Sequence, residues 1–413
     1  MTFRSNYFTQ ETAILALEGI RILDLTWQGP GPHCTFILGD MGAEIIKISP
    51  TVISGARQTT LGRGSREIVH QAINRNKKSI LLDLKSGEGR NIFHKLAQNA
   101  DVIVDGFRPG VVKRLSIDYK TISKFNPRII YCSITGYGQD GPYRDLPGHD
   151  INYISFGGFL NIVGEPDRPP IVPLNMVADY GAGGKDAAIG ILSALWVRNR
   201  TGKGQYIDIS LTDSVISLMT QSVLDPYFLN MKAPKRGEHD LGGAYPYYSI
   251  YQTKDGKFIT LGCLEPWLWA SFCQAIGKEE FMPFNFTRDR LPRSKDDKKA
   301  KEIFKYLKQL FLTKTRDEWF EFLSSRDVPV GKVYSLDEAF ADPQVLHRKM
   351  IMEFEHPTEG KVRQVGIAVK LSDTPGKVRS LPAMPGEHSE EILRGLGYSK
   401  KRIKELRKEG IIG

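Results

Sequence analysis

Two segments of the chain carry side chains suited to proton transfer. His149 lies between Gly148 and Asp150, and an imidazole with a reference pKa of about 6.5 can both give and take a proton near neutrality. A hydrogen-bonded loop histidine is the simpler alternative. Asp179 precedes four small residues, 181–184, and an apolar helical run. A helix N-cap is the more common role of such an aspartate, but glycine weakens the helix that it begins, so the small residues predict a close approach to the backbone.

A third carboxylate and a glycine-bearing turn are further candidates. Glu265 comes directly after an expected strand and before Pro266, and taken alone it indicates the acidic start of a helix. Gly29 and Gly31 lie in the sequence GPGPHC, between the first expected strand and a helix. Such a turn lets a ligand approach N–H groups at the positive end of a helix. The spacing is not GxGxxG, so a dinucleotide fingerprint is absent, and a tight structural turn is the alternative.

Basic residues gather near the ends of two expected strands. Arg75, Lys77 and Lys78 stand just before one strand, and Arg108 and Arg114 follow another. Open α/β sheets bind ligands at the carboxyl ends of their strands, and guanidinium groups pair well with phosphate. These residues predict contacts to a phosphate-bearing ligand, with solvated loop cations as the alternative for each. The formal charge of +10 suits a phosphorylated small molecule as well as nucleic acid.

Short buried strands alternating with helices are expected to position these groups. Ile- and Val-rich stretches predict strands, and amphipathic spacing predicts a helix at 86–99; the strands fall at 19–25, 44–48, 79–83, 101–105 and 128–134. Alternation of this kind is typical of a parallel sheet covered on both faces. Beyond about residue 215 the pattern predicts a smaller α+β domain, with a hairpin over 247–263 turned at Lys254-Asp255-Gly256. Helices are expected near 266–276, 297–313 and 315–325.

The composition is that of an ordinary globular protein. The 413 residues, 41% hydrophobic and 25% charged, predict two or three domains and exclude a disordered or collagen-like chain. No apolar run reaches the roughly 18 residues of a membrane span, and no signal-peptide pattern is found. Four cysteines lie far apart, which favours a reducing compartment. We expect a cytoplasmic protein, with an organellar matrix as the alternative.

Many ordered segments together resemble the family III CoA-transferases and, within them, the α-methylacyl-CoA racemases. The similar segments run nearly from end to end: LEGIRILDL, GPGPHC, LGDMGAEIIKI, GFRPGVVKRL, ITGYGQDGP, GHDINY, PLNMVADYGAGG, TGKGQYIDISLTD, GGAYPYY, LGCLEP, DPQVLHR and PGEHSEEILRGLGYS. The aspartate at Asp179 is common to transferases and racemases. The histidine of GHDINY, His149, and the glutamate of LGCLEP, Glu265, are features of the racemases.

The resemblance implies a Rossmann-like parallel-sheet large domain, a smaller α+β domain, and an interlocked homodimer with its active site at the dimer interface. Residues 1–215 and 331–413 would then form the large domain, and 216–330 the small one. It also implies an acyl-CoA thioester as substrate, so that coenzyme A enters as part of the substrate and no separate cofactor or metal is required. Nucleic-acid and membrane partners are not expected.

The resemblance further implies racemisation at the α-carbon of 2-methylacyl-CoA thioesters through an enolate. His149 and Asp179 would form an opposed acid–base pair, and Glu265 would orient the imidazole. Backbone N–H groups of Asp179, Tyr180 and Gly181 would meet the enolate oxygen. A CoA-transferase that uses Asp179 as a nucleophile to form a mixed anhydride is the first alternative, and a non-catalytic CoA-binding protein is the second.

Some segments depart from the family pattern. Ser49-Pro50 and an insertion over 51–73, with Arg57, Arg63 and Arg66, stand where relatives carry a basic residue or a short charged stretch. Altered adenine and phosphate contacts are expected there. Trp27 and Gln28 replace smaller residues before the GPGP turn, which predicts a narrower pocket near the pantetheine thiol.

An adaptable surface for the acyl chain is a further hypothesis. Met219, Met231, Tyr227 and Phe228 lie in one segment, and methionine suits a surface that accepts varied shapes. Ordinary core packing is the favoured alternative for these residues.

Overall fold

The chain divides into two compact units, each assembled from separated segments. The computed structural model describes residues 14–51, 65–232, 234–285 and 298–413. The large unit combines Met1–Gly157, Pro173–Leu218 and Pro343–Gly413, and the second unit combines Gly158–Val172 and Met219–Asp342. Within the described residues, no helix combines the length and the apolar character needed to cross a bilayer.

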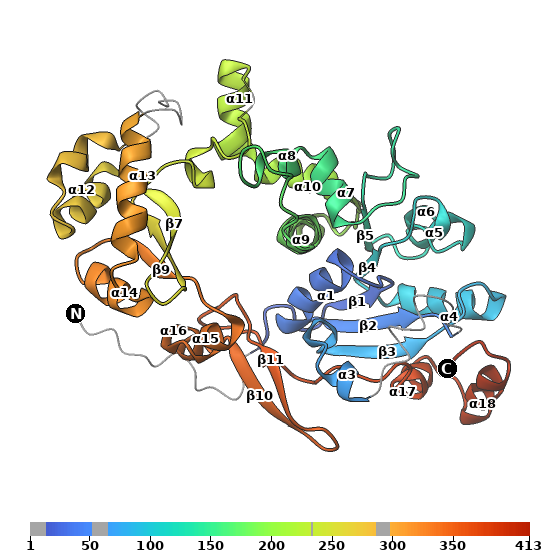
Figure 1. The fold of residues 1–413 in the computed structure, drawn as a ribbon. Helices are drawn as coiled ribbons and strands as arrows, with labels where there is room; N and C mark the ends of the chain where they lie inside the picture. The colour runs from blue at the N-terminus through green and yellow to red at the C-terminus, as the bar shows by residue number, and fades with distance from the viewer. Residues whose placement is uncertain (1–13, 52–64, 233, 286–297) are drawn as a thin grey trace. The chain divides into compact units, whose positions relative to one another are not determined.

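A six-stranded parallel sheet forms the centre of the large unit (Figure 1). Its strand order is β3-β2-β1-β4-β5-β6, with β1 Arg21–Asp24, β2 Glu44–Ser49, β3 Lys77–Leu81, β4 Val102–Asp105, β5 Ile130–Thr135 and β6 Tyr206–Ser210. This is the doubly wound order of dinucleotide-binding sheets. All residues of β4 and β5 are buried, as expected for central strands covered on both faces.

Helices cover both faces of this sheet (Figure 1). On one face, α1 (Pro30–Asp40) packs against α9 (Gly184–Thr201). On the other, α4 (Gly87–Gln98) buries its apolar stripe with the C-terminal helices α17 (Ser389–Gly395) and α18 (Lys400–Lys408). The remaining elements of the unit are α3 Ser65–Val69, η1 Ala72–Asn74, α5 Val111–Arg114, α6 Tyr119–Ile122, α7 Asp150–Phe156, the π-helix η2 Met176–Gly183, α10 Leu211–Leu218, α16 Pro343–His347, and the hairpin β10 Ile351–His356 with β11 Gly360–Val365.

The predicted strands of the large unit are confirmed, with small shifts at their ends. Strand β3 is displaced by two residues at both ends, since it spans Lys77–Leu81 rather than 79–83. Strand β6 was not predicted. It is an edge strand in which only Ser210 is buried, so it lacks the continuous apolar run of its neighbours.

The second unit is an α+β structure with an aromatic core. Strands β7 (Tyr248–Gln252) and β8 (Phe258–Gly262) form the predicted antiparallel hairpin, and β9 (Val330–Lys332) pairs with β8. The helices α12 (Pro266–Ala275), α13 (Lys298–Phe311) and α14 (Arg316–Ser324) agree with the predicted segments. Trp269, Phe272 and Phe311 lie fully buried in the core. Shorter helices complete the unit: α8 Phe159–Ile162, η3 Thr220–Leu224, α11 Asp225–Asn230, η4 Asp240–Gly242, η5 Glu279–Phe284 and α15 Leu336–Ala341.

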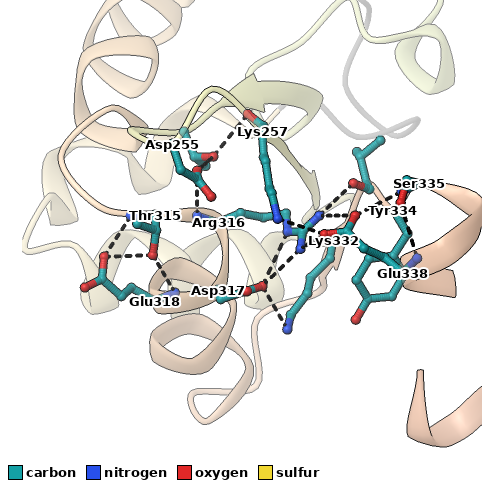
Figure 2. A network of polar contacts seen from close by, with 12 residues as sticks. Asp255, Lys257, Thr315, Arg316, Asp317, Glu318, Lys332, Tyr334, Ser335 and Glu338 are labelled. Carbon is teal, nitrogen blue, oxygen red and sulfur yellow. Dashed lines mark hydrogen bonds and ion pairs between the residues drawn. The ribbon is translucent and has the colours of Figure 1, made fainter. Parts of the chain in front are cut away.

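A network of charged groups joins four elements of the second unit (Figure 2). The buried guanidinium of Arg316 donates to both carboxylate oxygens of Glu338, at 3.0 and 2.8 Å, and to the carbonyl oxygen of Val333. Lys257 also contacts Glu338, at 2.8 Å. The parallel double contact is the strongest form of an arginine–carboxylate pair. It ties the start of α14 to the start of α15.

The boundaries of the two units differ in part from those expected. The second unit begins at Met219 and ends at Asp342, whereas 216 and 330 were expected. It also takes the segment Gly158–Val172 from within the expected large domain. Both ends of the chain contribute to the large unit.

Candidate active site

The carboxyl ends of β1 and β4 mark the place where this sheet can bind a ligand. The two strands are neighbours, and the strand order runs outward in opposite directions from them. Loops that leave adjacent strands toward opposite faces open a crevice at such a point. The turn containing Gly29 follows β1, and the loop containing Arg108 follows β4.

Gly29 brings the turn after β1 against the carboxylate of Asp179. Its backbone has φ 67° and ψ −126°, a conformation that L side chains rarely adopt. A Cβ at this position would lie 2.9 Å from Oδ2 of Asp179 and 3.2 Å from its Cγ. The glycine is therefore required by the close contact with Asp179. Gly31 has a different reason, since a Cβ there would overlap the side chain of Thr26, so its predicted ligand contact is not supported.

Asp179 lies in the π-helix η2, a form of helix that is rare and frequently occurs at functional sites. Its carboxylate is half-buried and accepts a hydrogen bond from the side-chain amide of Asn175 at 3.2 Å. Burial raises the pKa of Asp179, and the Asn175 hydrogen bond opposes this shift. The negative charge of Asp150 raises the pKa further, whereas His149 lowers it.

Asp150, which the sequence analysis did not single out, fastens the π-helix in place. Its buried carboxylate accepts the backbone N–H of Asp179 at 2.9 Å. Burial raises the pKa of Asp150, and the N–H groups of Asp179 and Ala178 counter the rise. The only feature of the sequence that could have drawn attention to Asp150 is that it directly follows His149. In this structure the Asp179 N–H is engaged by Asp150, and its role as a donor to an enolate oxygen stays a prediction.

His149 is placed beside Asp179 by helix α7. It is the exposed residue that precedes the helix, and its N–H donates to the side-chain oxygen of Asn152 at 3.0 Å. Helix α7 contacts the π-helix η2, and the imidazole acts electrostatically on Asp179. The structure therefore brings the two predicted acid–base residues into one site.

The small residues after Asp179 are explained by packing within the protein. A Cβ on Gly183 would overlap Leu211, and one on Gly184 would lie 2.8 Å from Nδ1 of His33. On Gly181 it would lie 2.8 Å from the carbonyl oxygen of Met176. The predicted close approach is real, but the approaching groups belong to the chain itself.

Lys77 supports the Gly29 turn from within the protein and is not available to a ligand. Its buried ammonium donates to Asp24 at 3.2 Å, to Thr35 at 2.7 Å and to the carbonyl oxygen of Pro32 at 3.1 Å. Burial lowers the pKa of Lys77 to about 8. Burial alone would raise the pKa of Asp24, but Lys47 and Lys77 outweigh it and hold this pKa well below its usual range. The prediction of a phosphate contact is wrong for Lys77.

Arg75 and Lys78 are also engaged elsewhere. Arg75 is fully buried and pairs with both carboxylate oxygens of Asp40, at 2.9 and 2.6 Å. Lys78 pairs with Glu44 and Glu391 and lies near the amino end of β3, at the opposite edge of the sheet from the site. The prediction of phosphate contacts is wrong for Arg75 and is not supported for Lys78.

Arg108 and Arg114 remain candidates for phosphate contacts. Both side chains are exposed, and both follow the carboxyl end of β4. The charge of Arg108 acts on Tyr153, a residue of α7 one turn beyond His149. Of the basic residues in the insertion, Arg57 and Arg63 lie outside the described residues, while Arg66 lies in α3.

Other predicted site residues lie in the second unit or remain untested. Glu265 precedes α12 there and makes no side-chain cap to that helix, so its role toward His149 stays a prediction. Tyr180 packs edge-on against His33 at 5.2 Å between ring centroids. The N–H groups of Tyr180 and Gly181 as enolate donors also stay predictions.

The hypothetical acyl-chain surface is only partly core. Met219 is buried, which agrees with core packing, but Phe228 and Met231 are 65% and 72% exposed. Tyr227 packs against Phe228 with ring centroids 5.7 Å apart. Core packing is therefore wrong for Phe228 and Met231.

Comparisons with known proteins agree with the α/β fold and identify one protein family. The family model for CoA-transferase family III matches residues 17–389. Alpha-methylacyl-CoA racemase of Homo sapiens is 32% identical over 401 residues, covering 96% of this chain and 98% of that protein. Succinyl-CoA:glutarate CoA-transferase of Mus musculus is 35% identical over 402 residues, covering 96% and 90%. A crystal structure of a CAIB/BAIF family protein from Brucella suis has a TM-score of 0.77 at 28% identity, covering 92% of this chain and 99% of that one.

The chain belongs to CoA-transferase family III. Relatives named for racemisation and for CoA transfer are about equally similar to it. Family membership therefore defines an enzyme family of acyl-CoA chemistry and does not choose between the two reactions.

Proposed function

We propose that this protein racemises the α-carbon of 2-methylacyl-CoA thioesters by a 1,1-proton transfer. The observation that carries the proposal is the juxtaposition of two different acid–base groups. His149 is exposed beside the half-buried Asp179, on elements that contact one another. An imidazole is a feature that acyl transfer through an aspartyl anhydride does not require.

Racemisation needs a base on each face of the reacting carbon. One member of the pair takes the α-proton, and the electron pair of the broken C–H bond moves onto the thioester oxygen to form an enolate. The other member returns a proton to the opposite face. Burial raises the pKa of Asp179, which makes this carboxylate a stronger base and a more available acid than a solvated aspartate. Each group is expected to contribute about 10²- to 10⁴-fold.

The coenzyme A portion of the substrate supplies binding energy far from the reacting carbon. We assign its phosphates to Arg108 and Arg114, whose exposed guanidinium groups follow β4. Such remote contacts fix the geometry of the reacting groups. Glu265 is assigned the orientation of the imidazole, and the N–H groups of Tyr180 and Gly181 are assigned to the enolate oxygen.

A homodimer, interlocked as the family resemblance implies, is part of this proposal. Helix α9 presents an apolar stripe at helical spacing, in which Ile189, Leu192 and Trp196 are 60%, 43% and 67% exposed. Large apolar side chains in one row on a surface helix are typical of a protein interface. Light scattering should give twice the chain mass, and Trp196→Glu should shift the protein toward monomer.

Exchange with solvent deuterium tests the reaction directly. A (2R)-2-methylacyl-CoA incubated in D₂O should gain deuterium at C2, and His149→Ala should abolish the exchange while CoA binding remains. Absence of exchange by the wild-type protein with several acyl chains would rule out the racemase proposal.

A CoA-transferase is the second candidate, favoured by the 35% identity to a succinyl-CoA:glutarate CoA-transferase. Asp179 would attack the thioester carbonyl, release CoA thiolate and form a mixed anhydride. The thiolate would then attack the aspartyl carbonyl and release the donor acid, and the acceptor carboxylate would displace the thiolate to form a second anhydride. Attack of the thiolate on the acceptor's carbonyl would give the new acyl-CoA and free Asp179. Hydroxylamine should trap acylated Asp179 and inactivate the enzyme, and turnover should require a free carboxylic acid. Tight CoA binding with neither reaction would instead indicate a non-catalytic binding protein.

A further inference from the structure

Tyr153 lies next to the acid–base pair on an element already placed at the site. It belongs to the first turn of α7, the helix whose N-cap residue is His149. Its side chain is 8% exposed. Burial raises the pKa of Tyr153 to about 12, and the charges of Asp179 and Arg108 act on the same hydroxyl. The phenol therefore keeps its proton at physiological pH, so it can donate or accept a hydrogen bond but does not act as a base.

Two glycines hold the ring of Tyr153 in one position. A Cβ on Gly136 would overlap the ring and lie 2.8 Å from the hydroxyl oxygen. A Cβ on Gly148 would lie 2.7 Å from ring carbon Cε1. Tyr137 packs edge-on against the ring, with centroids 5.3 Å apart. Because Gly136 directly follows β5, the hydroxyl lies at the carboxyl edge of the sheet, beside the loops that follow β1 and β4.

The hydroxyl has no hydrogen-bond partner among the described residues, although its ring is held on several sides. One donor expected at the site, the Asp179 N–H, is bound to Asp150 in this structure. A fixed donor aimed at the position of developing charge is usually a large contribution to catalysis. When the α-carbon loses its proton, negative charge develops on the thioester carbonyl oxygen.

We propose that Tyr153 is a catalytic residue whose hydroxyl donates a hydrogen bond to the thioester carbonyl oxygen and holds the enolate oxygen that replaces it. The phenol keeps its proton throughout, so the α-proton moves only between the substrate and the acid–base pair. The effect of Tyr153 on the reaction rate rests on the proposed racemase function. The hydrogen bond from Tyr153 to the carbonyl oxygen does not, because it can form whichever reaction the bound thioester undergoes.

Ligand affinity tests the contact without any turnover. The probes are 2,2-dimethylpropanoyl-CoA, which has no α-hydrogen, and the matching thioether, which has CH₂ in place of the carbonyl. A hydrogen bond with a net value of 0.5–1.5 kcal/mol corresponds to about a 2- to 12-fold preference of the wild-type protein for the thioester. Tyr153→Phe should remove this preference, and Tyr143→Phe, in the same ring cluster, should keep it. Equal preference in wild type and Tyr153→Phe would overturn the proposal.

Deuterium exchange tests the catalytic consequence. Tyr153→Phe, which leaves the ring in its glycine-lined position, should lower kcat by about 10²- to 10³-fold, while KM should rise by no more than the roughly 2- to 12-fold expected from the lost ground-state hydrogen bond. An undiminished kcat would overturn the catalytic role. If wild type shows no exchange, the proposed racemisation fails, and the affinity comparison still decides whether Tyr153 contacts the carbonyl oxygen.

Discussion

Replacing Gly29 with alanine tests whether the contact between the turn after β1 and Asp179 sets the geometry of the site. The new methyl carbon would lie 2.9 Å from Oδ2 and 3.2 Å from Cγ of Asp179. Carbon contacts are most favourable at about 3.5–4.0 Å. Either the carboxylate or the turn must therefore move by roughly half an ångström.

Two separate costs follow from this change. A non-glycine residue at φ 67° and ψ −126° is strained by about 1–3 kcal/mol, which lowers the free energy of unfolding. The displaced carboxylate lowers the rate, since a misplacement of about 1 Å can cost 10²-fold. We expect Gly29→Ala to reduce kcat by roughly 10- to 100-fold, with a smaller effect on KM.

Urea denaturation measures the first cost and deuterium exchange at C2 measures the second. Gly397→Ala is the matched control, because Gly397 also has a positive φ, of 85°, but a methyl carbon added there would meet no atom within 4 Å beyond its own chain neighbours. It should lose stability and keep its rate. If Gly29→Ala loses stability but exchanges deuterium at the wild-type rate, the turn does not position Asp179 and the reasoning is refuted.

Substitutions at three further positions probe carboxylates or the partner of one. Asp150→Ala, which releases the N–H of Asp179, should lower kcat by at least about 10²-fold, whereas Asp150→Asn, which retains an acceptor, should be much less affected; equal losses would contradict the anchoring role. Burial raises the pKa of Asp105 to about 6 from 3.8, so the folded state binds more protons than the unfolded state and the free energy of unfolding falls as the pH rises from about 4 to 6. Asp105→Asn should remove this pH dependence and raise the free energy of unfolding at pH 8 by up to about 3 kcal/mol. An unchanged pH dependence in urea titrations would contradict this prediction. Arg316→Ala, which leaves Glu338 without its double contact, should lower the midpoint of thermal denaturation, and an unchanged midpoint would show that the network contributes little to stability.

The elements that could be predicted from the sequence are those with a local signal, such as a run of consecutive apolar residues or a turn with glycine. The central strands β4 and β5 are buried throughout and mostly apolar, and the Lys254-Asp255-Gly256 turn places glycine where φ is 73°, so both were predicted. The edge strand β6 and the hairpin of β10 and β11 alternate partly exposed residues and were missed. The π-helix at Asp179 has no compositional signature, since it differs from an α-helix only in its hydrogen-bond register.

His149 and Asp179 could be named as candidates because proton transfer is a property of these residue types, whereas their pairing was implied by the family resemblance. The buried cations could not, because their roles depend on partners distant in sequence. Arg75 reaches Asp40, and Lys77 reaches Asp24, but neither aspartate differs in sequence from a surface acid. Position near a strand end does not say along which direction a long side chain runs. Asp150 was missed because attention went to the neighbouring His149, and because its contact with the N–H of Asp179 is not visible in the sequence.

The division of the large unit among distant segments has a consequence for how the protein is made. Its first strands are completed by the last residues of the chain: the N–H of Asp83 donates to the carbonyl oxygen of Ile411, and Leu82 bridges to Ile412. During synthesis, the first strands therefore keep exposed the apolar surface that α17, α18 and Ile412 cover in the folded protein. This surface is covered only after Ile412 has been translated. Chaperone demand during expression, and sensitivity to fusions placed after the last helix, are expected to follow from this late closure.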